Sequence, residues 1–268
     1  MENQANQKVE QGGRNVPKRL KELFIMIAPF VLVLLVGSFY ASHKQNQEIT
    51  NEFKSALNGQ TTDSEYSKIL NQVFVYFKQE SEASFHYSHQ LDNSNVLEAE
   101  SFASKSSIAQ INEMLTNTLA ELDSYDETMT KALNGARQMI QNSNLSESQK
   151  TEMLTGFNKG AGDQESNRLG KARVVAMRNF YEKVLTLYEF MLANFNDYKI
   201  QSDSSGNSQV SFYSDTNITR YNQIYADVQR LATEYVKANK EFTDYKDKNF
   251  KDGGINVNSS DVQNYFNQ

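Results

Sequence analysis

The chain has 268 residues, a formal net charge of −6, no cysteine and only two prolines. The acidic balance argues against nucleic acid as a partner, because a phosphate backbone attracts basic surfaces. The lack of cysteine excludes disulfides, thiol chemistry and the usual lipoprotein anchor, so a folded domain in this chain must be stabilised by packing.

The most informative segment is the apolar run LFIMIAPFVLVLLVGSFYAS at residues 23–42, which carries no charged side chain. A helix of this length extends about 30 Å, the thickness of the hydrocarbon core of a bilayer. It is preceded by Lys18, Arg19 and Lys21, and basic flanks of this kind tend to stay in the cytoplasm. The sequence therefore predicts a short basic cytoplasmic tail at residues 1–22, a single transmembrane anchor and a large domain beyond it.

The alternative is a cleaved signal peptide, because the unbroken apolar run from Leu23 to Val36 is short enough for one. Two features favour an uncleaved anchor. The leader before the run is long for a signal peptide, and bulky Phe39 stands two positions before Ala41, where cleavage would need a small residue. We expect a single-pass protein of a bacterial inner membrane, with its N-terminus in the cytoplasm and its C-terminal domain in the periplasm.

The part after the anchor contains no proline and little glycine, which is typical of long helices joined by few loops. All-β and α/β domains of this size need turn residues at many corners. We therefore predict an all-α class, with an elongated antiparallel helical bundle over residues 43–250 and a flexible C-terminal tail at 251–268.

Apolar side chains three and four residues apart predict the individual helices of this bundle. They are expected at residues 43–58, 64–89, 108–139, 146–158, 166–198 and 215–245. The third, fifth and last of these keep a heptad rhythm, which implies narrow coiled-coil-like contacts between neighbouring helices. Ser146 and Gln149 have the spacing of a capping box at the start of the fourth.

Two connecting segments have recognisable composition. Residues 156–163, GFNKGAGD, predict a flexible glycine-rich loop. No strand precedes this loop and no Gly-Lys-Ser/Thr follows, so it lacks the features of a phosphate loop. Between the last two long helices, Ile200, Val210 and Phe212 flank a Ser-Gly-Asn turn, which predicts a small β-hairpin.

Few residues suggest chemistry. His86 and His89 are one helical turn apart, and Glu82 precedes His86 by four positions, so the three could share a helix face. Zinc needs three or four ligands in a closed shell, and no fourth is evident, so polar residues at the end of a helix are the favoured interpretation. There is no Gly-x-Ser-x-Gly nucleophile motif. We therefore expect a non-enzymatic protein without a metal or other cofactor.

Basic residues gather at the start of the fifth expected helix, where positive charge opposes the helix dipole. They are Arg168, Lys171, Arg173 and Arg178. Lys171 and Arg178 are seven positions apart and share a face, whereas Arg173 points elsewhere. These side chains either pair with nearby acidic residues or form a contact site for an anionic group or a protein partner.

These observations favour a membrane-anchored interaction or scaffold protein that works through helix-to-helix contacts. Its partner would be another protein or a second copy of the same chain. The alternative is a ligand-sensing or binding module of a membrane complex, with its site between the last two long helices.

Overall fold

The computed structural model describes residues 64–92, 94, 96–202 and 208–252, and the single positions 51, 54, 55, 58, 60 and 261. Within these ranges the chain is mostly helical, with one two-stranded antiparallel sheet, which confirms the predicted helical class and the hairpin. In chain order the elements are α4 (Glu65–Ser84), α5 (His86–Asp92), η1 (Ala99–Phe102), α6 (Lys105–Asp123), α7 (Tyr125–Gln141), α8 (Glu147–Ala161), α9 (Gln164–Ala193), η2 (Phe195–Asp197), β1 (Tyr198–Ser202), β2 (Ser208–Phe212) and α10 (Asp215–Asp252).

The predicted anchor at residues 23–42 lies outside the described residues, as do most of the expected first helix at 43–58 and most of the tail after Asp252. Among the residues that are described, no helix is both long enough and apolar enough to cross a membrane. The anchor therefore stays a prediction from the sequence.

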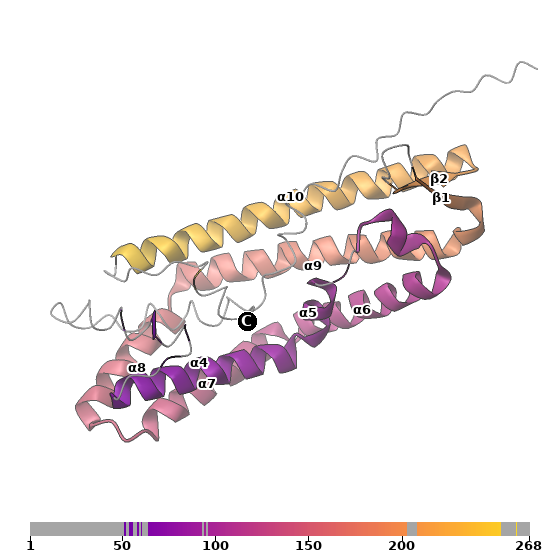
Figure 1. Cartoon of the computed structure of the whole chain (residues 1–268). Helices are drawn as coiled ribbons and strands as arrows, with labels where there is room; N and C mark the ends of the chain where they lie inside the picture. Colours follow the sequence, from indigo (N-terminus) through magenta and orange to yellow (C-terminus); the bar gives the residue numbers. More distant parts are fainter. Residues whose placement is uncertain are drawn as a thin grey trace, which may run out of the picture.

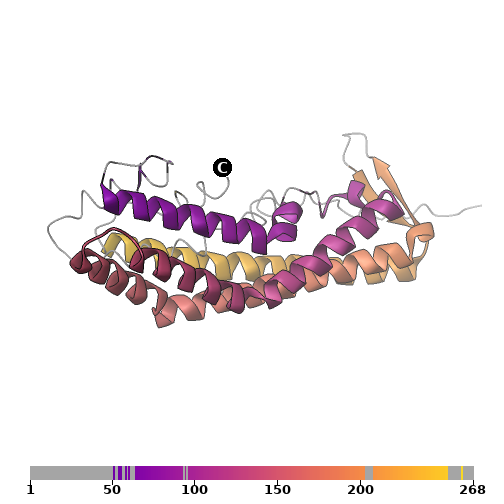
Figure 2. The same cartoon turned by 90° about the horizontal axis from the view of Figure 1, so that it is seen from below.

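The long helices run side by side along one direction, which makes the molecule elongated (Figures 1 and 2). α9 and α10 are joined through the hairpin and pack against each other in opposite directions. α6 packs on α9, α4 packs on α7, and α7 also contacts α8. The hairpin lies at one end of the molecule and α8 at the other (Figure 1).

The core between α9 and α10 follows the predicted stripes. Its fully buried side chains include Phe180, Tyr181, Val184, Leu187, Tyr188 and Met191 from α9, and Ile224, Val228, Tyr235 and Phe242 from α10. The rings of Phe180 and Tyr235 stack with centroids 6.4 Å apart. Each large apolar side chain buried in this way contributes about 1.5–3 kcal/mol, so the stripe is the main stabilising contact of the pair.

The single helix predicted at 108–139 is wrong, because the structure has two helices, α6 and α7, that meet at Ser124. The buried stripe continues across this break through Leu122, Tyr125 and Met129. The Ser124 hydroxyl donates to the carbonyl of Ala120 at 3.2 Å, and serine back-bonding of this kind bends helices. The apolar period could not reveal the break, since both helices turn the same stripe inward.

The glycine-rich loop predicted at 156–163 is also wrong. α8 continues to Ala161, with Gly156 and Gly160 inside the helix and buried. Each glycine costs a helix about 1 kcal/mol relative to alanine, and packing offsets that cost here. Only Gly162 and Asp163 separate α8 from α9.

The start of α8 confirms the predicted capping box, in which Ser146 and Gln149 bond to each other's backbone N–H. Farther along, the Arg137 Nε of α7 donates to Asn158 Oδ1 at 2.8 Å. The same guanidinium lies 5.4 Å from the ring centre of Phe157. These contacts hold α8 against α7 in a region that composition alone assigned to a loop.

The predicted hairpin between α9 and α10 is confirmed, and the structure pairs Ile200 with Val210 and Tyr198 with Phe212. The Tyr198 and Phe212 rings are buried with centroids 5.3 Å apart. The Tyr198 hydroxyl donates to the carbonyl of Phe102 at 2.7 Å. The hairpin is therefore packed onto η1 and forms part of the core at this end.

The expected second helix bends at Phe85 and becomes α4 and α5. The start of α5 is held by the carboxylate of Glu121 from α6. This carboxylate accepts from the N–H of Tyr87 at 2.7 Å, the N–H of Ser88 at 3.0 Å and the Ser88 hydroxyl at 2.7 Å. The first N–H groups of a helix have no partner inside it, so Glu121 supplies the acceptor that these donors need.

Replacing Glu121 with alanine should lower the free energy of unfolding by about 1–3 kcal/mol, because partly buried donors lose a charged acceptor. Urea unfolding followed by circular dichroism measures the change. Glu113→Ala is the matched control on an exposed position of the same helix, and it should change the value by less than about 0.5 kcal/mol. Equal effects of the two substitutions would contradict the capping role.

Candidate functional site

The predicted basic cluster lies on α9, and the structure places its members in two environments. Arg168, Lys171 and Arg178 are partly or fully exposed and ion-paired, whereas Arg173 is buried. Arg168 pairs with Glu165 of its own helix at 2.6 Å. The four residues therefore do not form one continuous patch.

Lys171 and Arg178 both reach the break between α6 and α7. Lys171 Nζ lies 3.2 Å from the carboxylate of Asp126 at the start of α7. Arg178 pairs with Asp123 at the end of α6 and with Glu182 of α9. Exposed pairs of this kind contribute less than about 1 kcal/mol each. Since a paired side chain can still meet a partner, the contact site stays a prediction.

Asp163 fixes the start of α9 to the far end of α10. Its carboxylate accepts from the backbone N–H of Glu165 at 3.1 Å and of Ser166 at 3.4 Å, as the N-cap of α9. It also accepts from the Tyr245 hydroxyl at 2.8 Å and from the side chain of Asn249 at 3.4 Å, both on α10. An acidic cap is favourable at a helix start, and it offsets the basic residues that follow.

Two buried cations lie against the ring of Phe242 on α10, and one of them, Lys246, is near the carboxylate of Asp163. Arg173 of α9 is 2% exposed and Lys246 of α10 is 3% exposed. The Arg173 Cζ is 5.7 Å and the Lys246 Nζ 5.6 Å from the ring centre of Phe242, contacts that are strongest when they are desolvated. Burial lowers the pKa of Lys246 to about 8, and the nearby charge of Asp163 opposes this shift.

Reading the sequence missed this polar layer, although a signal was present. Arg173 stands four positions before the core residue Met177, and Lys246 stands four positions after the core residue Phe242. Residues four apart share a helix face, so both charges lie on the buried stripes. Arg173 was grouped with the basic cluster instead, and Lys246 was not singled out.

The histidines are not arranged as a metal site. His86 is exposed, and its Nε2 lies 2.8 Å from the side-chain nitrogen of Gln90. His89 is half-buried, and burial lowers its pKa. Within the described part of the chain, no group of three histidine, aspartate or glutamate side chains could hold a metal ion.

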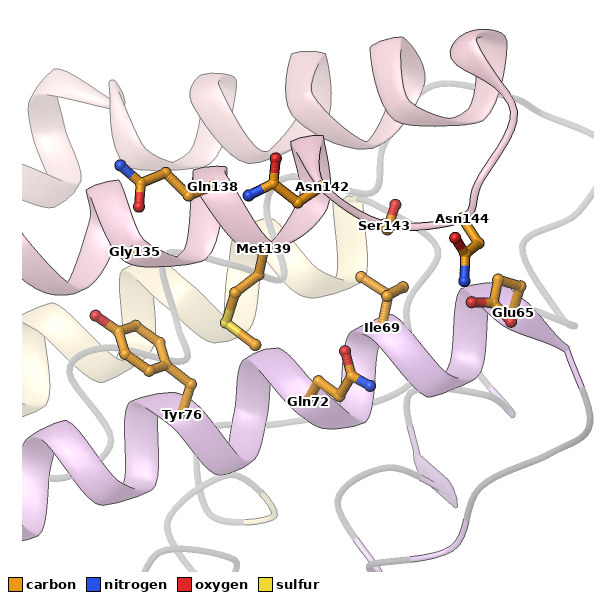
Figure 3. Close-up of a pocket in the computed structure, with 10 residues that line it drawn as sticks. All are labelled: Glu65, Ile69, Gln72, Tyr76, Gly135, Gln138, Met139, Asn142, Ser143 and Asn144. Carbon is orange, nitrogen blue, oxygen red and sulfur yellow. The ribbon is translucent and has the colours of Figure 1, made fainter.

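A groove of about 590 Å³ lies between α4 and α7 (Figure 3). It is lined by Glu65, Ile69, Gln72 and Tyr76 on the α4 side and by Gly135, Gln138, Met139, Asn142, Ser143 and Asn144 on the α7 side. The α4 residues recur at helical spacing, so one face of that helix forms a continuous wall.

Gly135 and Tyr76 close one end of this groove (Figure 3). A Cβ at position 135 would overlap the ring and hydroxyl of Tyr76, so glycine lets the ring lie directly on α7. Burial raises the pKa of Tyr76, and the nearby charge of Glu80 adds to this. The phenol therefore stays neutral and can donate a hydrogen bond at physiological pH.

The groove is not where the ligand-binding alternative expected a site. That alternative placed it between the last two long helices. The space there contains Phe180, Val184, Tyr188, Val228 and Tyr235, which are almost completely buried. The cavity between α4 and α7 is formed by residues that the sequence did not single out for binding.

Comparison with protein-family models, with curated proteins and with solved structures finds no match for this chain. A function for this chain is therefore inferred from the chemistry and placement of the residues described above.

The lowered pKa of Lys246 predicts that the folded protein gains stability as the pH rises from about 8 toward the ordinary lysine value of 10.5. In this window the unfolded chain still holds the proton that the folded chain has released. From about pH 7.5 to about pH 9.5, the unfolding free energy of the wild type minus that of Lys246→Met should increase by about 1–2 kcal/mol.

Denaturant titrations at the two pH values measure this difference. Subtracting the variant removes the contribution of the tyrosines, which act in the opposite direction at higher pH. Lys248→Met, at an exposed position of the same helix, is the control and should show no such increase. If the unfolding free energy of the wild type minus that of Lys246→Met changes with pH no more than the same difference for Lys248→Met, the pKa of Lys246 is not lowered.

Proposed function

We propose that this protein is a membrane-anchored, non-enzymatic interaction protein, whose helical domain outside the membrane contacts a protein partner or a second copy of itself. The apolar segment at residues 23–42 and its basic flank support the anchor. The long packed helices support a role through surface contacts.

The observation that carries this proposal is the rod formed by α9 and α10. α10 has 38 residues and is about 57 Å long at about 1.5 Å per residue. Its inner face is buried along most of that length against α9, so the two helices stiffen each other. A stiff rod holds binding surfaces at a fixed distance from its attachment point, which is what a scaffold requires.

The contact surface that we propose is the exposed part of the basic cluster. The side chains of Lys171 and Arg178 are 66% and 41% exposed, beside the break at Ser124. Basic side chains on an acidic protein attract acidic groups and steer their approach. Arg168 extends this surface toward the start of α9, whereas buried Arg173 supports it from inside the core.

The membrane placement can be tested with alkaline phosphatase, which is active only after export from the bacterial cytoplasm. A fusion after residue 60 should be active in cells, because the basic flank keeps residues 1–22 inside. A fusion after residue 22 is the control and should be inactive. The reverse pattern would overturn the proposed topology.

The partner contact can be tested by affinity recovery of the full chain from cross-linked membranes. Lys171→Glu with Arg178→Glu should reduce recovery of the partner, or of a differently tagged second copy, at least tenfold. Helicity and melting should change little, because the exposed pairs are weak. Wild-type recovery in this variant at both low and moderate salt would remove the cluster from the proposal.

The matched control is Arg230→Glu with Lys237→Glu. These residues are also seven positions apart, exposed and ion-paired, but they lie on α10. Their reversal should leave recovery unchanged. If the wild type itself recovers neither a protein nor a second copy, the interaction function is wrong.

A further inference from the structure

The groove between α4 and α7 differs in chemistry from the ion-paired surface of α9 and α10. Among the described residues that line it, Glu65 is the one that is charged, and Lys68 Nζ lies 3.7 Å from that carboxylate. A lining of this kind offers no strong attraction to phosphate or other anions. Its occupant should therefore be neutral.

Four carboxamide side chains line this groove, namely those of Gln72, Gln138, Asn142 and Asn144. Each carries two N–H donors and a carbonyl acceptor. None of the four side chains makes a hydrogen bond to another described residue, whereas Asn158 and Asn217 are held by neighbouring side chains. The groove therefore presents a dense set of donors and acceptors that the fold does not use.

Apolar surface lies between these amides. It comes mainly from Met139, whose half-buried side chain points from α7 toward α4 (Figure 3), because Ile69 is only 4% exposed. The neutral hydroxyl of Tyr76 lies against Gly135 and closes one end. A ligand that fits must combine many hydroxyl or amide groups with small apolar faces.

Sugars have this combination, because a pyranose ring carries hydroxyls around its edge and C–H groups on its faces. Glu65 and Tyr76 are eleven helical positions apart, about 16 Å along α4, which suits a short chain of sugars better than a single ring. The volume of about 590 Å³ lies within the range of about 300–1,000 Å³ usual for ligand sites. We infer that the α4–α7 groove binds a neutral oligosaccharide.

The test uses the full chain in lipid nanodiscs, because many detergents carry sugar head groups. The probes are maltotriose and tri-N-acetylchitotriose, titrated separately by isothermal calorimetry. At least one should bind saturably. Gln138→Ala and Asn142→Ala should each weaken that binding about threefold to tenfold, since each removes hydrogen bonds to the ligand.

Gln141→Ala is the matched control, because it removes an exposed amide from the same helix outside the groove. It should bind the sugar as the wild type does. The variant with Lys171→Glu and Arg178→Glu should also keep its affinity, so this inference stands or falls independently of the proposed partner contact.

Three results would overturn the inference. They are a lack of saturable binding by both trisaccharides at millimolar concentration, an affinity that Gln138→Ala and Asn142→Ala leave unchanged, and tighter binding of the capped peptide acetyl-trialanine-amide than of either sugar. The last result would assign the groove to peptide chains, whose backbone amides also match its lining.

Discussion

The antiparallel packing of α9 on α10 is the contact on which the remaining structure depends. Its core is a stripe of aromatic and aliphatic side chains that includes the stacked rings of Phe180 and Tyr235. The hairpin joins the pair at one end, and Asp163 ties it at the other by capping α9 and accepting from α10. α6 then packs on α9, and the hydroxyls of Tyr188 and Tyr198 hold η1, so this pair positions α6 and η1 directly. α5 packs on α6, and α4 packs on α7.

A polar layer interrupts that core. Arg173 and Lys246 are buried against the ring of Phe242, and Lys246 is also near the carboxylate of Asp163. Removing cations from water costs several kcal/mol, and the contacts with the ring and the carboxylate offset part of this cost. Sliding α10 along α9 by one turn would separate Lys246 from Asp163 while leaving it buried. The layer therefore favours a single register of the two long helices. An apolar stripe alone would distinguish less well between neighbouring registers.

The two surfaces proposed for function differ in chemistry and in position. The surface on α9 is basic and exposed, and Lys171 there pairs with Asp126 at the start of α7. The groove is neutral and rich in amides, and it uses Gly135 and the residues after it at the opposite end of α7. The residues of the first proposed surface are not among those that line the second, so the two proposals concern separate parts of the molecule.

The sequence by itself determined the helical class, the hairpin, the capping box at Ser146 and the buried stripes, because these depend on spacings within one or two turns. Only the tertiary structure decided the break at Ser124, the helical state of Gly156 and Gly160, and the burial of Arg173. At Ser124 a local bond from the hydroxyl to the carbonyl of Ala120 accompanies the bend, and the apolar period does not encode it. At Gly156, Gly160 and Arg173 packing against other parts of the fold outweighs a local preference, and composition cannot indicate which neighbour will be present. The groove was hidden because its two walls, residues 65–76 and 135–144, are far apart in the chain and meet only because α4 packs on α7.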